Sequence, residues 1–149
     1  MGRMQHHTDP QLRPAVPNDA DELFRMAQLL ATSATPQRQT FDHLLTEILA
    51  DPHQYLLVAA APTGLSGYLY GLIHPAFHAN GKIAWAEELF VDPDLRGAGL
   101  GRKLMTDFED WAKQVGHAQY IAVATRRAHD FYDAIGFAES ATYFKKTLT

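Results

Sequence analysis

The chain of 149 residues contains no cysteine. Disulfides, thiolate nucleophiles and zinc sites built from cysteine are therefore excluded, and the composition is compatible with a reducing cytoplasm. Two histidine pairs are present, His6 with His7 and His74 with His78. Neither pair has a carboxylate or a further histidine placed to complete a metal site. We predict a cytoplasmic protein that binds no metal ion.

Long apolar runs and a large excess of one charge are also missing. No stretch approaches the roughly 18 apolar residues of a membrane span, and residues 1–8 lack the apolar core of a signal peptide. The formal net charge of −4 gives no general electrostatic reason to bind nucleic acid. We expect neither a membrane nor a nucleic acid as partner. We expect a flexible segment at residues 1–10 and one domain at residues 11–149.

The order of hydrophobic patterns predicts a mixed α/β (α+β) domain. Short apolar runs bounded by proline and glycine predict strands at residues 12–15, 55–61, 67–73, 83–91, 120–124 and 137–146. Apolar residues three and four apart predict helices at residues 19–30, 41–50, 100–115 and 128–135. Asn18 or Asp19 is expected to cap the first helix and Thr40 the second, and loops are expected at 31–39 and 74–82. This order predicts a largely antiparallel sheet flanked by helices, with one parallel β-α-β step.

A glycine-rich turn follows the strand expected at residues 83–91. Seven residues lead from this turn into the next helix: Arg96, Gly97, Ala98, Gly99, Leu100, Gly101 and Arg102. Glycine tolerates positive φ and close approach of the backbone to a ligand. Several N–H groups and the positive end of a helix dipole then meet at one point, which is suited to phosphate, and the two arginines add full charges. The alternative is a turn that merely starts a helix.

The spacing of these glycines excludes two common phosphate-binding motifs. No Gly-Lys-Ser or Gly-Lys-Thr occurs in the chain, so a P-loop is absent. In the dinucleotide fingerprint Gly-x-Gly-x-x-Gly, the third glycine would fall on Arg102 or Leu104. The motif that is present reads Arg-x-x-Gly-x-Gly.

A second motif occurs downstream of the glycine turn. It reads Ala-x-x-Phe-Tyr-x-x-x-Gly-Phe, from Ala128 to Phe137. The two motifs together resemble the GNAT superfamily of acyl-CoA N-acyltransferases, and the resemblance extends from about Leu12 to Phe144. It implies a single-domain GNAT fold, acetyl-CoA as co-substrate and a homodimer. Some members carry asparagine near position 125, where this chain has Thr125, so the partner of the cofactor arm at that point stays open.

The resemblance also implies how acetyl-CoA is held. The turn would bind the pyrophosphate, and the pantetheine arm would lie along the end of the preceding strand, which carries a bulge in this family. An N–H at Phe90 or a neighbour would face the thioester oxygen. The residues expected to bind the cofactor are Leu89, Phe90, Val91, Arg96, Gly97, Ala98, Gly99, Leu100, Gly101, Arg102, Thr125 and Tyr132.

Two side chains are candidates for the chemistry of acyl transfer. The attacking amine must lose a proton, and Glu88, less so Glu87, is placed on the strand to accept it, directly or through a water. The alternative is that both are solvated carboxylates at a strand edge. Tyr132 is expected to donate a proton to the leaving thiolate or to orient the cofactor. Its spacing with Ala128 and Ile135 also fits a side chain of the core.

The acceptor is expected to be a primary amine of a small molecule. Residues 33–39, residues 74–82 and the strand with Tyr68 and Tyr70 are candidates for the lining of its pocket. The segments around Phe77, Glu88 and Tyr132 look similar to aminoalkylphosphonate and aminoglycoside acetylating members. Two alternatives remain open at this point: an acetyltransferase of protein lysines or N-termini, and an acyl-CoA-binding module without turnover.

Overall fold

The computed structural model describes residues 9–149, which contain one mixed five-stranded sheet in the order β1-β2-β3-β4-β5. The first four strands are antiparallel to their neighbours, and β5 runs parallel to β4. The strands are β1 (Gln11–Pro14), β2 (Gln54–Ala61), β3 (Gly64–Ala76), β4 (Gly81–Val91) and β5 (Ala118–Val123). The expected mixed sheet with one parallel β-α-β step is confirmed. The expected segment at residues 1–10 falls almost wholly outside the described residues.

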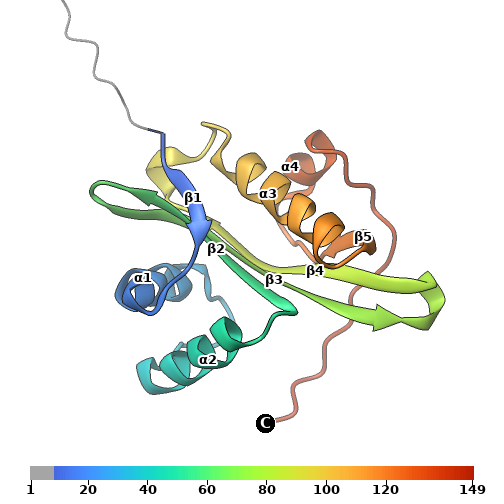
Figure 1. The fold of residues 1–149 in the computed structure, drawn as a ribbon, viewed down its shortest axis with the longest axis horizontal. Coiled ribbons are helices and arrows are strands. Elements are labelled where there is room, and N and C mark those ends of the chain that lie inside the picture. Colours follow the sequence, from blue (N-terminus) through green and yellow to red (C-terminus); the bar gives the residue numbers. More distant parts are fainter. Residues whose placement is uncertain (1–8) are drawn as a thin grey trace, which may run out of the picture.

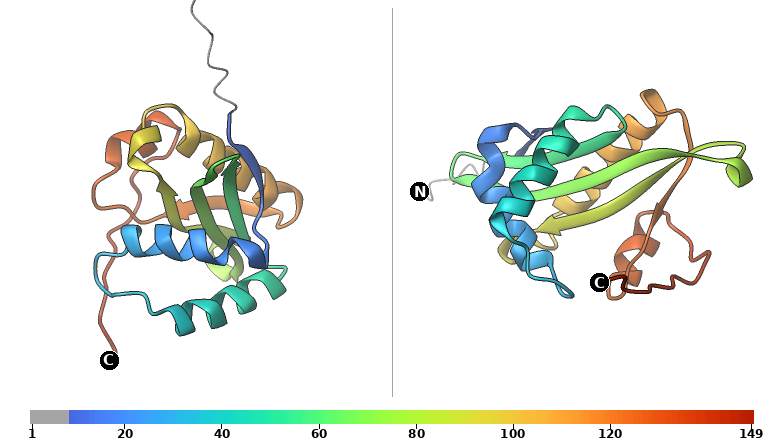
Figure 2. Two further views of the ribbon diagram at one scale, coloured as in Figure 1. Left: turned by 90° about the vertical axis from the view of Figure 1, so that its left-hand side faces the viewer. Right: turned by 90° about the horizontal axis from the view of Figure 1, so that it is seen from below.

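Four helices cover the two faces of the sheet (Figure 1). They are α1 (Ala20–Leu30), α2 (Arg38–Ala50), α3 (Leu100–Gln114) and α4 (His129–Ala134). Helices α1 and α2 lie on one face, and α3 and α4 lie on the other (Figures 1 and 2). Short 3₁₀ turns precede α1, join β3 to β4, and follow β4 at Pro93–Leu95. None of the described helices is long and apolar enough to cross a membrane.

Each face of the sheet buries its own hydrophobic cluster. On one face, Leu104 and Phe108 of α3 are fully buried against strand residues such as Leu69. On the other face, Leu23 and Met26 of α1 are buried against residues of β2, β3 and β4. We call these the α3 cluster and the α1 cluster. Because successive side chains of a strand point to opposite faces, alternate residues of β3 and β4 enter different clusters.

The expected loop at residues 74–82 is wrong. Strand β3 continues to Ala76, and His74 and Pro75 pair with Ile83 and Lys82 of β4 in a long hairpin. The pairing of β3 with β2 ends at Leu72, so no strand of the described residues 9–149 borders the other edge of β3 at Pro75. Proline is tolerated there because its missing N–H interrupts no ladder. The hairpin extends beyond the helices (Figure 2).

Three other local predictions need correction. Residues 137–146 form no strand, and every residue from 138 to 149 is exposed, because the segment leaves the sheet instead of pairing with β5. Helix α2 begins at Arg38, whose guanidinium donates to Asp42 four residues later, so Thr40 lies inside the helix and does not cap it. Strand β5 is shifted to Ala118–Val123 and is not buried, since Tyr120 is 44% exposed.

Asp19 precedes α1 as expected but does not cap it with its side chain. Its carboxylate instead accepts hydrogen bonds from both terminal nitrogens of Arg13, at 2.8 and 2.9 Å, and from the N–H of Val16 at 2.9 Å. The side chain therefore ties β1 to the start of α1. The Arg13 hydrogen bonds are the main reason that the pKa of Asp19 lies below its usual value, and the Val16 N–H adds to the effect.

Candidate active site

An opening in the sheet lies between the ends of β4 and β5. The two strands pair only as far as Ala86 opposite Val123. Within residues 9–149, the last part of β4, from Glu87 to Val91, has no strand beside it on that edge. An extended ligand can pair with backbone groups of such an edge as a further strand would. The residues expected to hold the pantetheine arm, Leu89, Phe90 and Val91, lie here.

A β-bulge in β4 determines where Glu88 points. Tyr70 pairs with Glu88 and the next residue, Gly71, pairs with Ala86, which leaves Glu87 as the extra residue. In a regular strand, Glu88 would point to the same face as Ala86, two residues earlier, and would enter the α3 cluster. The bulge moves it to the opposite face, on which Phe90 is buried. The bulge expected in this strand is thus present, at Glu87.

Glu88 is held by a buried tyrosine of the neighbouring strand. The hydroxyl of Tyr68 donates to Glu88 Oε1 at 2.6 Å. Tyr68 is only 3% exposed and lies in the α1 cluster, so its position is fixed by packing. Burial, followed by the negative charge of Glu88, raises the pKa of Tyr68 far above its usual value, so its hydroxyl remains a donor. Glu88 is half-buried, whereas Glu87 is exposed.

The glycine turn presents backbone N–H groups to an open space. Gly97 and Gly99 have φ of +88° and +86°, and a Cβ added at either would meet no atom within 4 Å. The hydrogen bonds inside the turn use the N–H groups of Leu95, Arg96 and Ala98. In the described part of the chain, the N–H groups of Gly97, Gly99 and the first three residues of α3 have no backbone acceptor. These donors and the open space around them suit the pyrophosphate of coenzyme A.

The third glycine of the turn has a different role. A Cβ on Gly101 would lie 3.3 Å from the ring of Phe131, so this glycine allows α4 to approach the start of α3. Arg102 extends from the same turn of helix and donates to the carbonyl of Ala134 at the end of α4, at 3.5 Å. The position of α4, and with it that of Tyr132, therefore depends on the beginning of α3.

Two further expected cofactor residues, Arg96 and Thr125, also make contacts within the protein. The Nε of Arg96 donates to the carbonyl of Val91 at 3.1 Å, and its guanidinium lies 5.8 Å from the ring centroid of Phe90. Thr125 Oγ1 accepts the N–H of Ala128 at 3.0 Å, which orders the turn before α4. Arg96 thus joins the end of β4 to the glycine turn. A role for either residue in binding the cofactor stays a prediction.

Tyr132 lies on the face of the sheet opposite Glu88. Its ring contacts Phe131 and Phe137 edge to face, at centroid distances of 4.9 and 5.4 Å, and packs against the α3 cluster. Burial raises the pKa of its phenol, which therefore stays protonated at neutral pH. A thioester held in the opening between β4 and β5 would have Glu88 on one side of the sheet and Tyr132 on the other.

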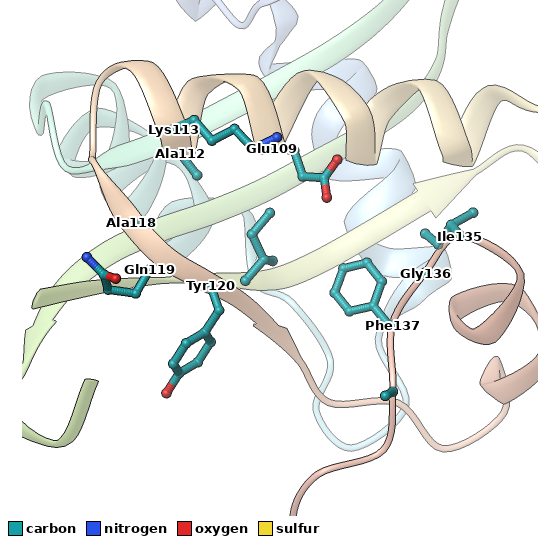
Figure 3. Close-up of a pocket in the computed structure, with 11 residues that line it drawn as sticks. Glu109, Ala112, Lys113, Ala118, Gln119, Tyr120, Ile135, Gly136 and Phe137 are labelled. Carbon is teal, nitrogen blue, oxygen red and sulfur yellow. The ribbon is translucent and has the colours of Figure 1, made fainter. Parts of the chain in front are cut away.

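A hollow of about 360 Å³ lies between α3, β5 and the segment after α4 (Figure 3). Figure 3 shows Glu109 and Lys113 of α3 above it and Tyr120 and Phe137 at its other sides. It contains none of the expected catalytic or cofactor residues. No group of three or more histidine, aspartate and glutamate side chains suited to a metal ion occurs in residues 9–149.

Comparison with known proteins identifies the family. The model of the acetyltransferase (GNAT) family matches residues 20–137, most of the chain. The chain belongs to the GNAT family. The family supports the expected enzyme class, an acyltransferase that uses acetyl-CoA as co-substrate. Both motifs from which the resemblance was drawn lie within the matched residues.

Similar proteins act on different amines. An aminoglycoside N(6')-acetyltransferase type 1 of Serratia marcescens is 28% identical over 133 residues, 80% of this chain and 89% of the relative. An aminoalkylphosphonate N-acetyltransferase of Salmonella typhimurium is 29% identical over 146 residues, 93% of this chain and 91% of the relative. With other curated relatives, the match spans only about half of their length.

Solved structures confirm the fold. Glucosamine-6-phosphate N-acetyltransferase from Arabidopsis thaliana superimposes with a TM-score of 0.82 at 20% identity, over 93% of this chain and 98% of that chain. At this identity the likeness concerns the arrangement of strands and helices. The match confirms the single-domain GNAT fold.

One pair of residues could not be found from sequence patterns. The Tyr68–Glu88 hydrogen bond joins residues that are 20 positions apart in sequence, and it depends on the register of β3 against β4 and on the bulge. The sequence predicts that Tyr68 lies on a strand near the acceptor, but no sequence pattern indicates that its hydroxyl bonds Glu88. The bulge could not be recognised from the sequence either. Two acidic residues followed by three apolar ones, from Glu87 to Val91, show no regular alternation of polar and apolar residues in which an extra residue would stand out.

Proposed function

We propose that this protein transfers the acetyl group of acetyl-CoA to a primary amine of a small molecule, by direct attack of the amine within a ternary complex. The observation that carries the proposal is the half-buried Glu88, fixed by Tyr68 beside the unpaired end of β4. That edge and the glycine turn supply the donors that acetyl-CoA needs. A carboxylate at this point can take the proton of the attacking amine.

In the proposed reaction, two side chains act on opposite faces of the sheet. The amine nitrogen forms a bond to the thioester carbon, and the bond from that carbon to sulfur breaks. Glu88 takes the proton of the amine, directly or through a water, and an N–H of Leu89 or Phe90 stabilises the negative charge that develops on the thioester oxygen. Tyr132 donates to the leaving sulfur. Since burial raises the pKa of Tyr132, hydrogen bonding to the thiolate is favoured over complete proton transfer.

The charges near Glu88 favour an acceptor with several ammonium groups. After the larger effect of burial, the negative charges of Glu87, Glu88 and Asp51 each raise the pKa of Tyr70. Three arginines lie on or beside the helices of this face, and each of them binds carboxylates: Arg13 binds Asp19, Arg25 binds Glu22 and Asp92, and Arg38 binds Asp21 and Asp42. We therefore favour a polyamine or an amino sugar over a phosphorylated amine as acceptor.

The test is a thiol-release assay with acetyl-CoA and a panel of amines. The panel pairs cationic acceptors (aminoglycosides and linear polyamines) with anionic ones (an aminoalkylphosphonate and glucosamine 6-phosphate), and includes lysine peptides. We expect turnover with the cationic small molecules and a kcat/KM for them at least tenfold above that for the anionic ones. Turnover with the phosphorylated amines alone would contradict the choice of acceptor. No acetylated product from any amine by mass spectrometry would contradict the enzyme.

We also propose a homodimer in the cytoplasm. The segment of residues 138–149 exposes Tyr143, Phe144 and Leu148 by 64%, 89% and 89%. Among the described residues, strand β5 has a neighbour only at β4, and the hollow of Figure 3 lies beside it. Pairing of this segment with β5 of a second copy would cover both surfaces. Sedimentation of the full chain and of a chain ending at residue 139 tests this, and a monomeric full chain would contradict it.

A further inference from the structure

The environment of Tyr68 differs from that of an ordinary buried tyrosine. Its ring lies 6.3 Å from the ring of Phe90, measured between centroids, in the buried cluster that also contains Leu23 and Met26 of α1. Within this apolar setting its hydroxyl has one recorded hydrogen-bond partner, the carboxylate of Glu88. A buried hydroxyl without a partner is costly, so the bond to Glu88 is strongly favoured in the folded protein.

The same bond has a consequence for Glu88. A glutamate on a strand samples several rotamers, and a flexible base spends little time in reach of the amine. The donation from Tyr68 engages Oε1 and leaves Oε2 without a recorded partner. Tyr70, two residues further along β3, does not share this task, because its hydroxyl bonds Gln54. Glu87 is exposed and has no comparable contact among the described residues.

We infer that Tyr68 is a positioning residue for the acyl transfer: its buried hydroxyl holds one oxygen of Glu88, so that the other oxygen faces the amine. This inference rests on the proposed function of Glu88 as the base. Tyr68 touches neither substrate. It acts only through Glu88, and the β-bulge that turns Glu88 onto this face is what brings the two together.

The first experiment is a double-mutant cycle on kcat with the variants Tyr68→Phe and Glu88→Gln. Tyr68→Phe keeps the ring and removes the hydroxyl, and we expect kcat to fall about tenfold with the KM for acetyl-CoA unchanged. In the Glu88→Gln background, the same change should lower kcat less than twofold, because the base is already absent. A tenfold loss in both backgrounds would overturn the inference.

Tyr55→Phe is a matched control. The hydroxyl of Tyr55 also donates to a carboxylate, that of Asp107, but on the other face of the sheet. Removing it deletes a bond of the same kind, so it should change the melting temperature without changing kcat. A loss of kcat in Tyr55→Phe as large as that in Tyr68→Phe would mean that both act through stability alone, and would also overturn the inference.

A second comparison needs no turnover and covers the case in which Tyr68→Phe fails to fold. Glutamine at position 88 can accept from Tyr68 through its amide oxygen, whereas leucine cannot. We expect Glu88→Leu to melt a few degrees below Glu88→Gln, because the buried hydroxyl of Tyr68 loses its acceptor. Equal melting temperatures would show that the bond does not hold Glu88. If the bond is confirmed but the wild type acetylates no amine, the proposed function fails and the contact is purely structural.

Discussion

The candidate site has two halves, one expected to bind acetyl-CoA and one expected to bind the amine. The first is built from backbone groups and the second from side chains. The half that suits acetyl-CoA consists of backbone N–H groups in an exposed turn, shaped by the positive φ of Gly97 and Gly99. The half proposed to face the amine consists of side chains, and its central residue, Glu88, is hydrogen-bonded to Tyr68 of a buried cluster. The cofactor half should therefore be sensitive to backbone conformation, and the acceptor half to the loss of single functional groups.

The largest effect is expected in the acceptor half. Glu88→Gln keeps the size of the side chain and removes the base, so kcat should fall about 10²- to 10³-fold. The KM for acetyl-CoA should change less than twofold, because the glycine turn is untouched. Glu87→Gln, one residue away on the bulge, is the control and should keep most of the activity. Steady-state kinetics on both variants test this, and a larger loss in Glu87→Gln would transfer the role of base to Glu87.

Tyr132 is the proposed donor to the leaving sulfur, and its removal should have the next largest effect. Tyr132→Phe keeps the contacts with Phe131 and Phe137 and removes the phenol, so kcat should fall about 10²-fold. Equilibrium binding of coenzyme A, measured by calorimetry, should stay within a few-fold of the wild type. A variant with wild-type kcat would leave Tyr132 as a residue of the core.

A backbone change should separate the cofactor half from the acceptor half. Gly99→Ala forces a non-glycine residue to φ of +86°, which costs about 1–2 kcal/mol or reshapes the turn. We expect the KM for acetyl-CoA to rise about tenfold and kcat to change little. Gly136→Ala carries the same strain at φ of +98°, also in open space, but lies outside the turn. Gly136→Ala should lower stability without affecting the KM for acetyl-CoA. An equal rise in this KM for both variants would contradict the assignment of the glycine turn to the cofactor half.

The difference between the halves also explains how far each could be predicted from sequence. The glycine turn is local: its residues are neighbours in the chain, so its positive φ angles and its place before a helix could be predicted from residues 96–102. The parallel step from β4 to β5 followed from the helix between them. Glu88 depends on long-range register, and neither the bulge at Glu87 nor the bond to Tyr68 leaves a local pattern. The loop predicted at residues 74–82 was wrong for the same reason. Proline is acceptable in strand β3 only because Pro75 lies beyond the end of the pairing with β2, and this depends on long-range register.

The smallest effect is expected from a change at Asp19, which lies outside the site and stabilises the elements that pack around the acceptor half. The carboxylate ties β1 to α1, the helix whose Leu23 and Met26 belong to the same buried cluster as Tyr68. Asp19→Asn weakens the bonds to Arg13 and should lower the free energy of unfolding at pH 7 by only about 1 kcal/mol, because the Arg13 side chain is 38% exposed. Binding of coenzyme A should not change, since the glycine turn lies elsewhere.

The dependence of this effect on pH follows from the lowered pKa of Asp19. In the unfolded chain an aspartate titrates near pH 3.9, as a typical value. The contribution of Asp19 is thus fully present above that pH and is lost as the pH falls through its lower pKa in the folded state. Urea unfolding should therefore show the gap between the wild type and Asp19→Asn at pH 7 and a narrower gap near pH 2.5. A gap of equal size at both pH values would mean that the contact stabilises the protein by packing, and that charge adds nothing to the support of the acceptor half.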